Sequence, residues 1–245
     1  MIVQSTDVTV MVSGKPMRVL VTEPARAGRY PGILMYSDIF QITGPQLRAS
    51  RRLAGYGFVV ATPEIFHRVE PAGTAIPFDD DGRTRGMAAA RASKVSELDA
   101  DCRATLDLLK AHAHVATNRL GAMGFCIGGH LGFRAALQPD VRAAALFYPT
   151  GVHDGKLGAD ADAGSLARAK EISGELLLIF GSRDPHVPEE GRKIIDTALR
   201  AAGTRFETRV FDAEHAFARD EGPRYDAEAT DDAWRDAIAF LRRVL

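Results

Sequence analysis

Three residues that together could carry out acyl transfer occur in this chain in the order cysteine, aspartate, histidine. Cys126 lies in a Gly-x-Cys-x-Gly-Gly pattern, Asp184 ends a Gly-Ser-Arg-Asp run, and His215 precedes Ala-Phe-Ala-Arg. A cysteine thiolate is a nucleophile, an imidazole can move a proton between sulfur and leaving group, and a carboxylate can hold the imidazole in one tautomer. These residues are therefore the candidate nucleophile, base and orienting acid.

The cysteine lies where a buried strand is predicted to turn sharply into a helix. An apolar run at 120–123 precedes it and a helical stretch at 130–137 follows it. This is the context of a G-x-S-x-G nucleophile elbow, here with Cys in place of Ser. Gly124 and Gly128 leave room for the turn, and the start of the following helix favours the reactive thiolate. The pattern predicts that Cys126 is the nucleophile of an α/β-hydrolase fold.

Asp184 and His215 each follow a predicted strand, at 176–180 and 205–211 respectively. Because the carboxyl ends of parallel strands meet at one edge of a sheet, we expect both side chains to lie near Cys126. The chain order nucleophile, acid, histidine is also the order that α/β hydrolases present.

Each of these roles has an alternative. Cys126 could be a small buried residue of a tight turn, and Asp184 could cap the helix expected at 189–201. His186 is a second possible base, but it directly follows a proline beside the acid, so we expect it to shape the loop. Cys102 lies on the apolar face of the helix predicted at 96–111, and we expect it in the core.

The elements that position these residues alternate between short apolar runs and segments of helical length. This alternation predicts parallel strands joined by right-handed crossovers. Buried strands are expected at residues 32–36, 57–61, 120–123, 143–147 and 176–180, and further helices at 47–54 and 223–244.

Two segments depart from that pattern. Residues 7–12 and 17–21, around Gly14-Lys15-Pro16, predict an antiparallel hairpin at the sheet edge. Residues 71–86 are rich in Gly, Pro and Asp without clear periodicity, which predicts a long loop. The expected fold is α/β: a mostly parallel, twisted sheet with helices on both faces and an N-terminal antiparallel hairpin.

Length and composition limit the possible classes of protein. A chain of 245 residues with 46% hydrophobic residues suits one domain spanning 1–245. Lys and Arg number 31 against 32 Asp and Glu, which indicates neither a nucleic-acid partner nor an acidic membrane surface. No apolar run approaches the roughly 20 residues of a membrane span, and the N-terminal residues lack a signal-peptide pattern, so we expect a cytoplasmic protein. The two cysteines form no metal-type pair, and neither a disulfide nor a metal site is expected.

From about Pro31 to its end the chain resembles the dienelactone hydrolases, also called carboxymethylenebutenolidases. The resemblance rests on the elbow and on matching short runs at residues 38–40, 55–57, 63–66, 181–184 and 215–219. It implies hydrolysis of an ester or lactone bond in a small, unsaturated, anionic carboxylate such as a dienelactone. The reaction would pass through an acyl-cysteine and use no metal or organic cofactor.

The resemblance also implies roles near the cysteine. Asp38 occupies the position of an acidic residue, Glu in the best-known members, that activates the thiol when substrate arrives. The aspartate is one methylene shorter, so its proton-transfer geometry is expected to differ. The backbone N–H groups of Ile39 and Ile127 would form the oxyanion hole, which agrees with their places after two neighbouring strands.

Substrate contacts are implied for three further residues. Arg85 and Arg219 match arginines that bind the substrate carboxylate, as a guanidinium fork suits. Tyr148 matches an aromatic residue of the pocket. His67 and Arg68 also follow a predicted strand and are possible pocket residues.

Two other functions remain open at this stage. A thioesterase or acyl transferase would use the same acyl-cysteine with another leaving group or acceptor. A non-catalytic small-molecule binder or thiol sensor would keep the scaffold alone. The sequence does not set the oligomeric state, and a monomer is compatible with it.

Overall fold

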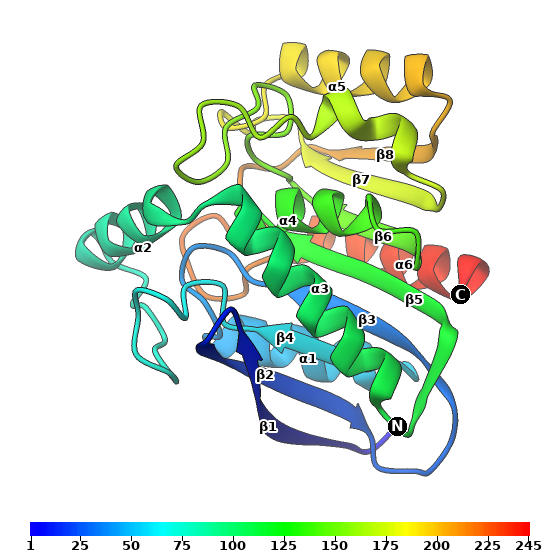
Figure 1. The fold of residues 1–245 in the computed structure, drawn as a ribbon. Helices are drawn as coiled ribbons and strands as arrows, with labels where there is room; N and C mark the ends of the chain where they lie inside the picture. Colours follow the sequence, from blue (N-terminus) through cyan, green and yellow to red (C-terminus); the bar gives the residue numbers. More distant parts are fainter.

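One eight-stranded sheet forms the centre of the computed structural model, which describes residues 1–245 (Figure 1). Its strand order is β1-β2-β4-β3-β5-β6-β7-β8. β1 and β2 pair antiparallel, β2 is antiparallel to β4, and all other neighbours are parallel. The strands are β1 (Val3–Val12), β2 (Lys15–Pro24), β3 (Tyr30–Tyr36), β4 (Val59–Pro63), β5 (Val115–Phe125), β6 (Val141–Phe147), β7 (Glu175–Gly181) and β8 (Arg205–Phe211). The predicted mostly parallel sheet with an N-terminal hairpin is confirmed.

Helices cover both faces of the sheet. In Figure 1, α3 and α4 lie in front of it and α1 and α6 behind it; α5, at the top of the view, shares the buried apolar cluster of α3 and α4. The helices are α1 (Gly44–Gly55), α2 (Asp80–Ala92), α3 (Val95–Ala111), α4 (Ile127–Ala136), α5 (Glu189–Ala202) and α6 (Ala227–Val244), with a short 3₁₀ helix at Leu166–Glu171. No helix has both the length and the apolar character that a membrane span requires.

The two faces bury separate apolar clusters. On the α1 and α6 side, Trp234 packs against Phe125 and Phe147, with ring centroids 6.1 and 5.8 Å apart. On the other side, the apolar face of α3 contributes Cys102, which is 2% exposed. The core position predicted for Cys102 is confirmed.

The hairpin turn lies slightly earlier than expected. Ser13 and Gly14 form a two-residue loop with φ of 49° and 78°, and Lys15 already belongs to β2. Such loops favour positive φ at both positions. Pro16 cannot adopt a positive φ, because its ring fixes φ near −65°.

The long loop predicted at 71–86 is wrong in its second half, because α2 begins at Asp80. The side chain of Asp79 accepts a hydrogen bond of 2.7 Å from the Gly82 N–H, and acidic residues in the first turn suit the positive end of the helix dipole. The helix projects from the body of the molecule (Figure 1), so it buries too narrow a face to show apolar periodicity. Asp79, a residue type that favours the N-cap position, is the residue from which the start of this helix could have been predicted.

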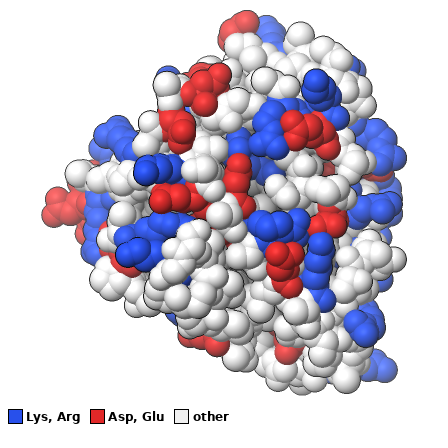
Figure 2. All heavy atoms as spheres, in the orientation of Figure 1, with Lys and Arg blue, Asp and Glu red and all other residues white.

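The last helix also starts later than expected, at Ala227 instead of near 223. Asp226 caps it by accepting a hydrogen bond of 3.0 Å from the Ala229 N–H. At the surface, acidic and basic side chains are interspersed over the face shown in Figure 2, as the nearly balanced composition predicts.

Candidate active site

Cys126 is the single residue between the end of β5 and the start of α4. Its backbone has φ 60° and ψ −121°, an uncommon conformation for a non-glycine residue that turns the chain sharply. A Cβ on Gly128 would lie 2.2 Å from the Ser37 carbonyl oxygen, and one on Gly124 would lie 1.9 Å from the Gly128 oxygen. Both glycines are therefore required by close backbone packing, and the cysteine is left partly exposed at the N-terminus of α4.

The acid and the histidine follow β7 and β8 and meet at this edge of the sheet. Nδ1 of His215 lies 2.7 Å from Oδ2 of Asp184, and both side chains are buried. Oδ1 of Asp184 accepts a second hydrogen bond, of 2.7 Å, from the His186 N–H. Burial alone would raise the pKa of Asp184, but the contacts with His215 and the His186 amide lower it. The carboxylate is thus held ionised against the imidazole.

The sulfur of Cys126 lies close enough to His215 to change its protonation. Burial alone would lower the pKa of His215, but the charge of Cys126 and the hydrogen bond to Asp184 raise it to about 9. A protonated imidazole beside the sulfur would stabilise a thiolate, the reactive form of cysteine.

Asp38 follows β3 and forms a partly shielded ion pair with Arg219. Oδ2 of Asp38 lies 3.1 Å from Nη1 of Arg219, and Oδ1 accepts a hydrogen bond of 2.9 Å from the Phe40 N–H. The guanidinium carbon lies 5.0 Å from the ring centroid of Phe40 and 4.6 Å from that of Phe78. Burial raises the pKa of Asp38, although the positive charges of Arg219 and His215 oppose this. The structure therefore brings Asp38 and Arg219 together beside the histidine.

The two proposed oxyanion-hole donors lie on neighbouring segments. Ile127 is the first residue of α4, so its N–H has no acceptor within the helix. The N–H of Ile39 donates to no main-chain acceptor. The Ser37 carbonyl packs against Gly128, which keeps the loop after β3 next to the elbow. Two backbone donors are thus available beside Cys126.

Arg85 is not brought to these residues. It lies on α2 with its side chain 49% exposed, and its Nε donates a hydrogen bond of 2.8 Å to Oε1 of Glu70. No ion pair or hydrogen bond joins it to Asp38, Arg219 or Cys126. The guanidinium predicted to bind substrate is occupied by Glu70 at the surface.

Tyr148 lies at the site and is deeply buried beside the histidine. It is 1% exposed, and its ring lies 5.1 Å from that of His215 and 5.4 Å from that of Phe217. Burial and the charges of Asp38 and Cys126 raise its pKa well above the ordinary value. Tyr148 therefore packs against the imidazole in this structure, and the substrate contact expected for it stays a prediction.

Sequence comparison identifies the kind of protein that carries this arrangement. The model of the dienelactone hydrolase family matches residues 17–245. The chain belongs to the dienelactone hydrolase family. This membership and its relatives make the protein a hydrolase of ester or lactone bonds in small molecules.

Individual relatives agree with the family match. A carboxymethylenebutenolidase homologue of Saccharomyces cerevisiae is 36% identical over 238 residues, which cover 93% of this chain and 85% of the yeast protein. A carboxymethylenebutenolidase of Pseudomonas sp. (strain P51) is 27% identical over 221 residues, covering 90% and 87%. The crystal structure of a dienelactone hydrolase homologue from Klebsiella pneumoniae has a TM-score of 0.83 at 22% identity, covering 99% of this chain and 100% of that one. That structure shows the α/β-hydrolase fold.

One neighbour of the nucleophile in this hydrolase, Thr150, was not predicted from the sequence. Thr150, just past β6, has its Oγ1 3.8 Å from the Cys126 sulfur, and its N–H donates to the Cys126 carbonyl at 3.2 Å. Nδ1 of His130 lies 3.1 Å from the Thr150 carbonyl oxygen, and its Nε2 lies 2.7 Å from the Ser165 hydroxyl. Burial lowers the pKa of His130 to about 3, so its ring is neutral. The position of Thr150 at a strand end was the available signal.

Two arginines near the histidines were also missed. The ring of His186 lies 4.6 Å from that of His215. Burial and the charge of His215 lower the pKa of His186, and the charges of Arg224 and Arg83 lower it further, while Asp184 opposes them. Arg83 is two residues before Arg85, and side chains two apart on a helix point about 200° apart. The charge of Arg83, whose side chain is 70% exposed, thus acts on His186, whereas the guanidinium of Arg85 is paired with Glu70.

His67 and Arg68 do not line the site. Nε2 of His67 lies 3.2 Å from Oδ1 of Asp101, and its Nδ1 lies 3.0 Å from the Pro16 carbonyl oxygen. Arg68 donates to both oxygens of Asp101 from its two terminal nitrogens. These residues tie the hairpin to α3, which leaves neither free to contact substrate.

Proposed function

We propose that this protein hydrolyses a small anionic ester or lactone through an acyl-cysteine intermediate on Cys126. The observation that carries the proposal is the 2.7 Å hydrogen bond between the His215 imidazole and the Asp184 carboxylate, with the charge of Cys126 acting on the same imidazole. A nucleophile, a base and an orienting acid in this arrangement are the components of acyl transfer.

The proposed reaction has two halves. The thiolate attacks the carbonyl carbon, and the N–H groups of Ile39 and Ile127 stabilise the oxyanion. The C–O bond to the leaving group then breaks, and the His215 imidazolium gives its proton to the departing oxygen. Neutral His215 next takes a proton from water, whose oxygen attacks the thioester carbon. The acid departs, and the thiolate and imidazolium are restored.

The ion pair of Asp38 with Arg219 supports a carboxylate on the substrate. A substrate carboxylate can replace Asp38 as the partner of the guanidinium, which Phe40 and Phe78 hold in place. Asp38 then loses its counter-ion within a shielded site, which increases its affinity for a proton. We infer that Asp38 accepts a proton at that moment, which removes one negative charge from the site as the Cys126 thiolate attacks.

The Cys126→Ala variant tests the nucleophile. We expect it to lose turnover of a panel of p-nitrophenyl esters and unsaturated lactones by at least about 10³-fold, because the acyl acceptor is gone. The Cys102→Ala variant, which removes the buried thiol of α3, is the matched control and should retain activity. Full activity of Cys126→Ala would rule out the mechanism.

The Arg219→Gln variant tests the charge of the substrate. A hydrogen bond to a charged group contributes about 1.5–3 kcal/mol, so kcat/KM for carboxylate-bearing esters should fall roughly 10- to 100-fold. Neutral esters of the same leaving group should lose much less. Arg85→Gln is the matched control, because the Arg85 guanidinium is already hydrogen-bonded to Glu70. An equal loss for charged and neutral esters would refute carboxylate binding by Arg219.

A further inference from the structure

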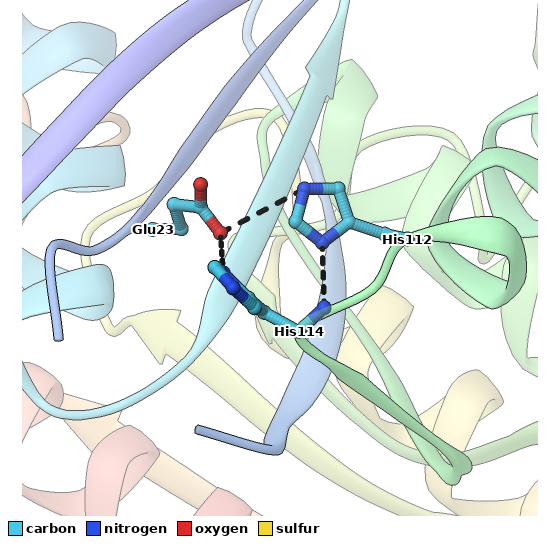
Figure 3. Close-up of side chains that lie close together, drawn as sticks. All are labelled: Glu23, His112 and His114. Carbon is cyan, nitrogen blue, oxygen red and sulfur yellow. Dashed lines mark hydrogen bonds and ion pairs between the residues drawn. The ribbon is translucent and has the colours of Figure 1, made fainter. Parts of the chain in front are cut away.

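A second cluster of potential ligands lies far from Cys126. Glu23 lies near the end of β2, and His112 and His114 lie in the connection between α3 and β5 (Figure 3). Val115 then begins β5, whose 11 residues lead to the elbow. At about 3.3 Å per residue, the cluster is roughly 35 Å from the nucleophile. It is therefore separate from the active site.

We propose that Glu23, His112 and His114 bind a divalent transition-metal ion such as zinc. One ligand atom from each side chain lies within 4.8 Å of the other two. Two imidazole nitrogens and one carboxylate oxygen suit zinc, copper or nickel, whereas magnesium and calcium prefer oxygen ligands alone. Figure 3 shows the three side chains pointing toward one another.

The separations of the ligand atoms suit a tetrahedral ion. Oε2 of Glu23 lies 2.8 Å from Nδ1 of His114 and 3.7 Å from Nε2 of His112. Ligands about 2.0–2.1 Å from a tetrahedral zinc ion are about 3.3 Å apart, a value between these two distances. Small side-chain rotations would therefore admit the ion, with water as a fourth ligand.

The surroundings prepare the carboxylate and leave access for an ion. Nε2 of Gln4 donates a hydrogen bond of 3.0 Å to Oε1 of Glu23, which orients Oε2 toward the histidines, as outer residues of metal sites do. The side chains of Glu23, His112 and His114 are 14%, 23% and 33% exposed, so the cluster is shielded but open.

Binding would require a change at His112. Its Nδ1 now accepts a hydrogen bond of 3.2 Å from the His114 N–H, which places the ring proton on Nε2. A metal on Nε2 needs that proton on Nδ1, so this hydrogen bond would be lost. We therefore expect weaker binding than at a closed four-ligand structural site.

The consequence for the molecule is structural. The ion would link the N-terminal hairpin to the connection that starts β5. At present the side chain of Glu23 joins these two segments through its contacts with the two histidines. Glu23 and His114 are 91 residues apart in the chain. No metal site was expected because only the spacing of the cysteines was considered. This cluster depends on the fold, so the spacing of residues along the chain does not reveal it.

Zinc titration of the full-length protein tests the proposal. Cys126 is first alkylated, since a thiolate beside an imidazole is itself a zinc ligand, and ZnCl₂ binding is then measured by calorimetry and thermal denaturation. We expect one zinc per chain and a rise in Tm of roughly 5–10 °C at a zinc concentration 100 times Kd. His112→Ala, His114→Ala and Glu23→Gln should each weaken binding at least about 10-fold. His153→Ala, which removes a partly exposed histidine elsewhere, should bind as the unsubstituted protein does.

Two results would overturn the proposal: no zinc binding by the alkylated protein, or undiminished binding by Glu23→Gln and His114→Ala. Glu23→Gln keeps the size of the side chain, so its loss of zinc affinity would be measured on a folded protein even if an alanine variant failed to fold.

Discussion

Cys126 combines an uncommon backbone conformation with a charged neighbour. Its φ of 60° is maintained because the surrounding chain fixes it: the Cys126 N–H donates to the Phe147 carbonyl at 3.1 Å, and the Cys126 carbonyl accepts from Gly129 and Thr150 at 2.9 and 3.2 Å. Strained residues of this kind persist only where the structure around them determines their conformation. The result is a sulfur held beside His215 at the start of a helix.

This arrangement makes a prediction about the titration of His215. Its imidazole should titrate near pH 9 in the unsubstituted protein, and its pKa should fall in Cys126→Ala, because burial is then opposed by Asp184 without the sulfur. Since folding raises this pKa, its contribution to stability is fully present below the ordinary pKa of about 6.5 and is lost as the pH rises through about 9. NMR of ¹⁵N-labelled imidazoles measures the titration, and Cys102→Ala is the control. Titration of His215 at the same pH in both proteins would contradict the thiolate–imidazolium pair.

At the scale of elements, most of the fold could be predicted because buried strands appear as short apolar runs. The strands that precede Cys126 and Asp184 were found this way. The strand predicted at 205–211, before His215, is β8, which is only partly buried. The ends of these strands bring the three residues together. α2 could not be found by periodicity, because it is largely exposed. The pairing of Arg85 with Glu70 could not be foreseen either, because it depends on where this helix lies in the fold. The burial of Tyr148 could not be foreseen, because a sequence position after a strand does not reveal how exposed the side chain is.

The elbow makes a prediction about its glycines. In Gly128→Ala the new Cβ would lie 2.2 and 2.8 Å from the carbonyl oxygens of Ser37 and Tyr36, which are backbone atoms that cannot rotate away. We expect a loss of roughly 1–3 kcal/mol in the free energy of unfolding, with reduced turnover as the loop after β3 moves. Denaturant unfolding and steady-state kinetics measure the two effects.

Gly55→Ala is the matched control, because the nearest atom to its new Cβ is 3.7 Å away. It should change stability by less than about 1 kcal/mol. If Gly128→Ala matched it in both stability and turnover, the close packing of the elbow on the loop after β3 would not be required.

At the scale of the whole molecule, the candidate active site and the proposed metal site lie at opposite ends of the sheet. The carboxyl ends of the parallel strands gather the candidate catalytic residues, as expected for an open α/β sheet. The opposite end gathers Glu23, His112 and His114 from segments that no local pattern connects. Sites of the first kind can be predicted from motifs at strand ends, whereas sites of the second kind need the fold. The single domain over residues 1–245 and the cytoplasmic location stay predictions.

The most direct test of the central claim is mass spectrometry of the protein mixed with p-nitrophenyl acetate and with unsaturated lactones that bear a carboxylate. We predict a transient acyl adduct on the peptide that contains Cys126, which disappears as the acid product is released. The adduct should be absent from Cys126→Ala. Steady turnover with no adduct on Cys126, even after rapid acid quenching, would contradict the acyl-cysteine mechanism.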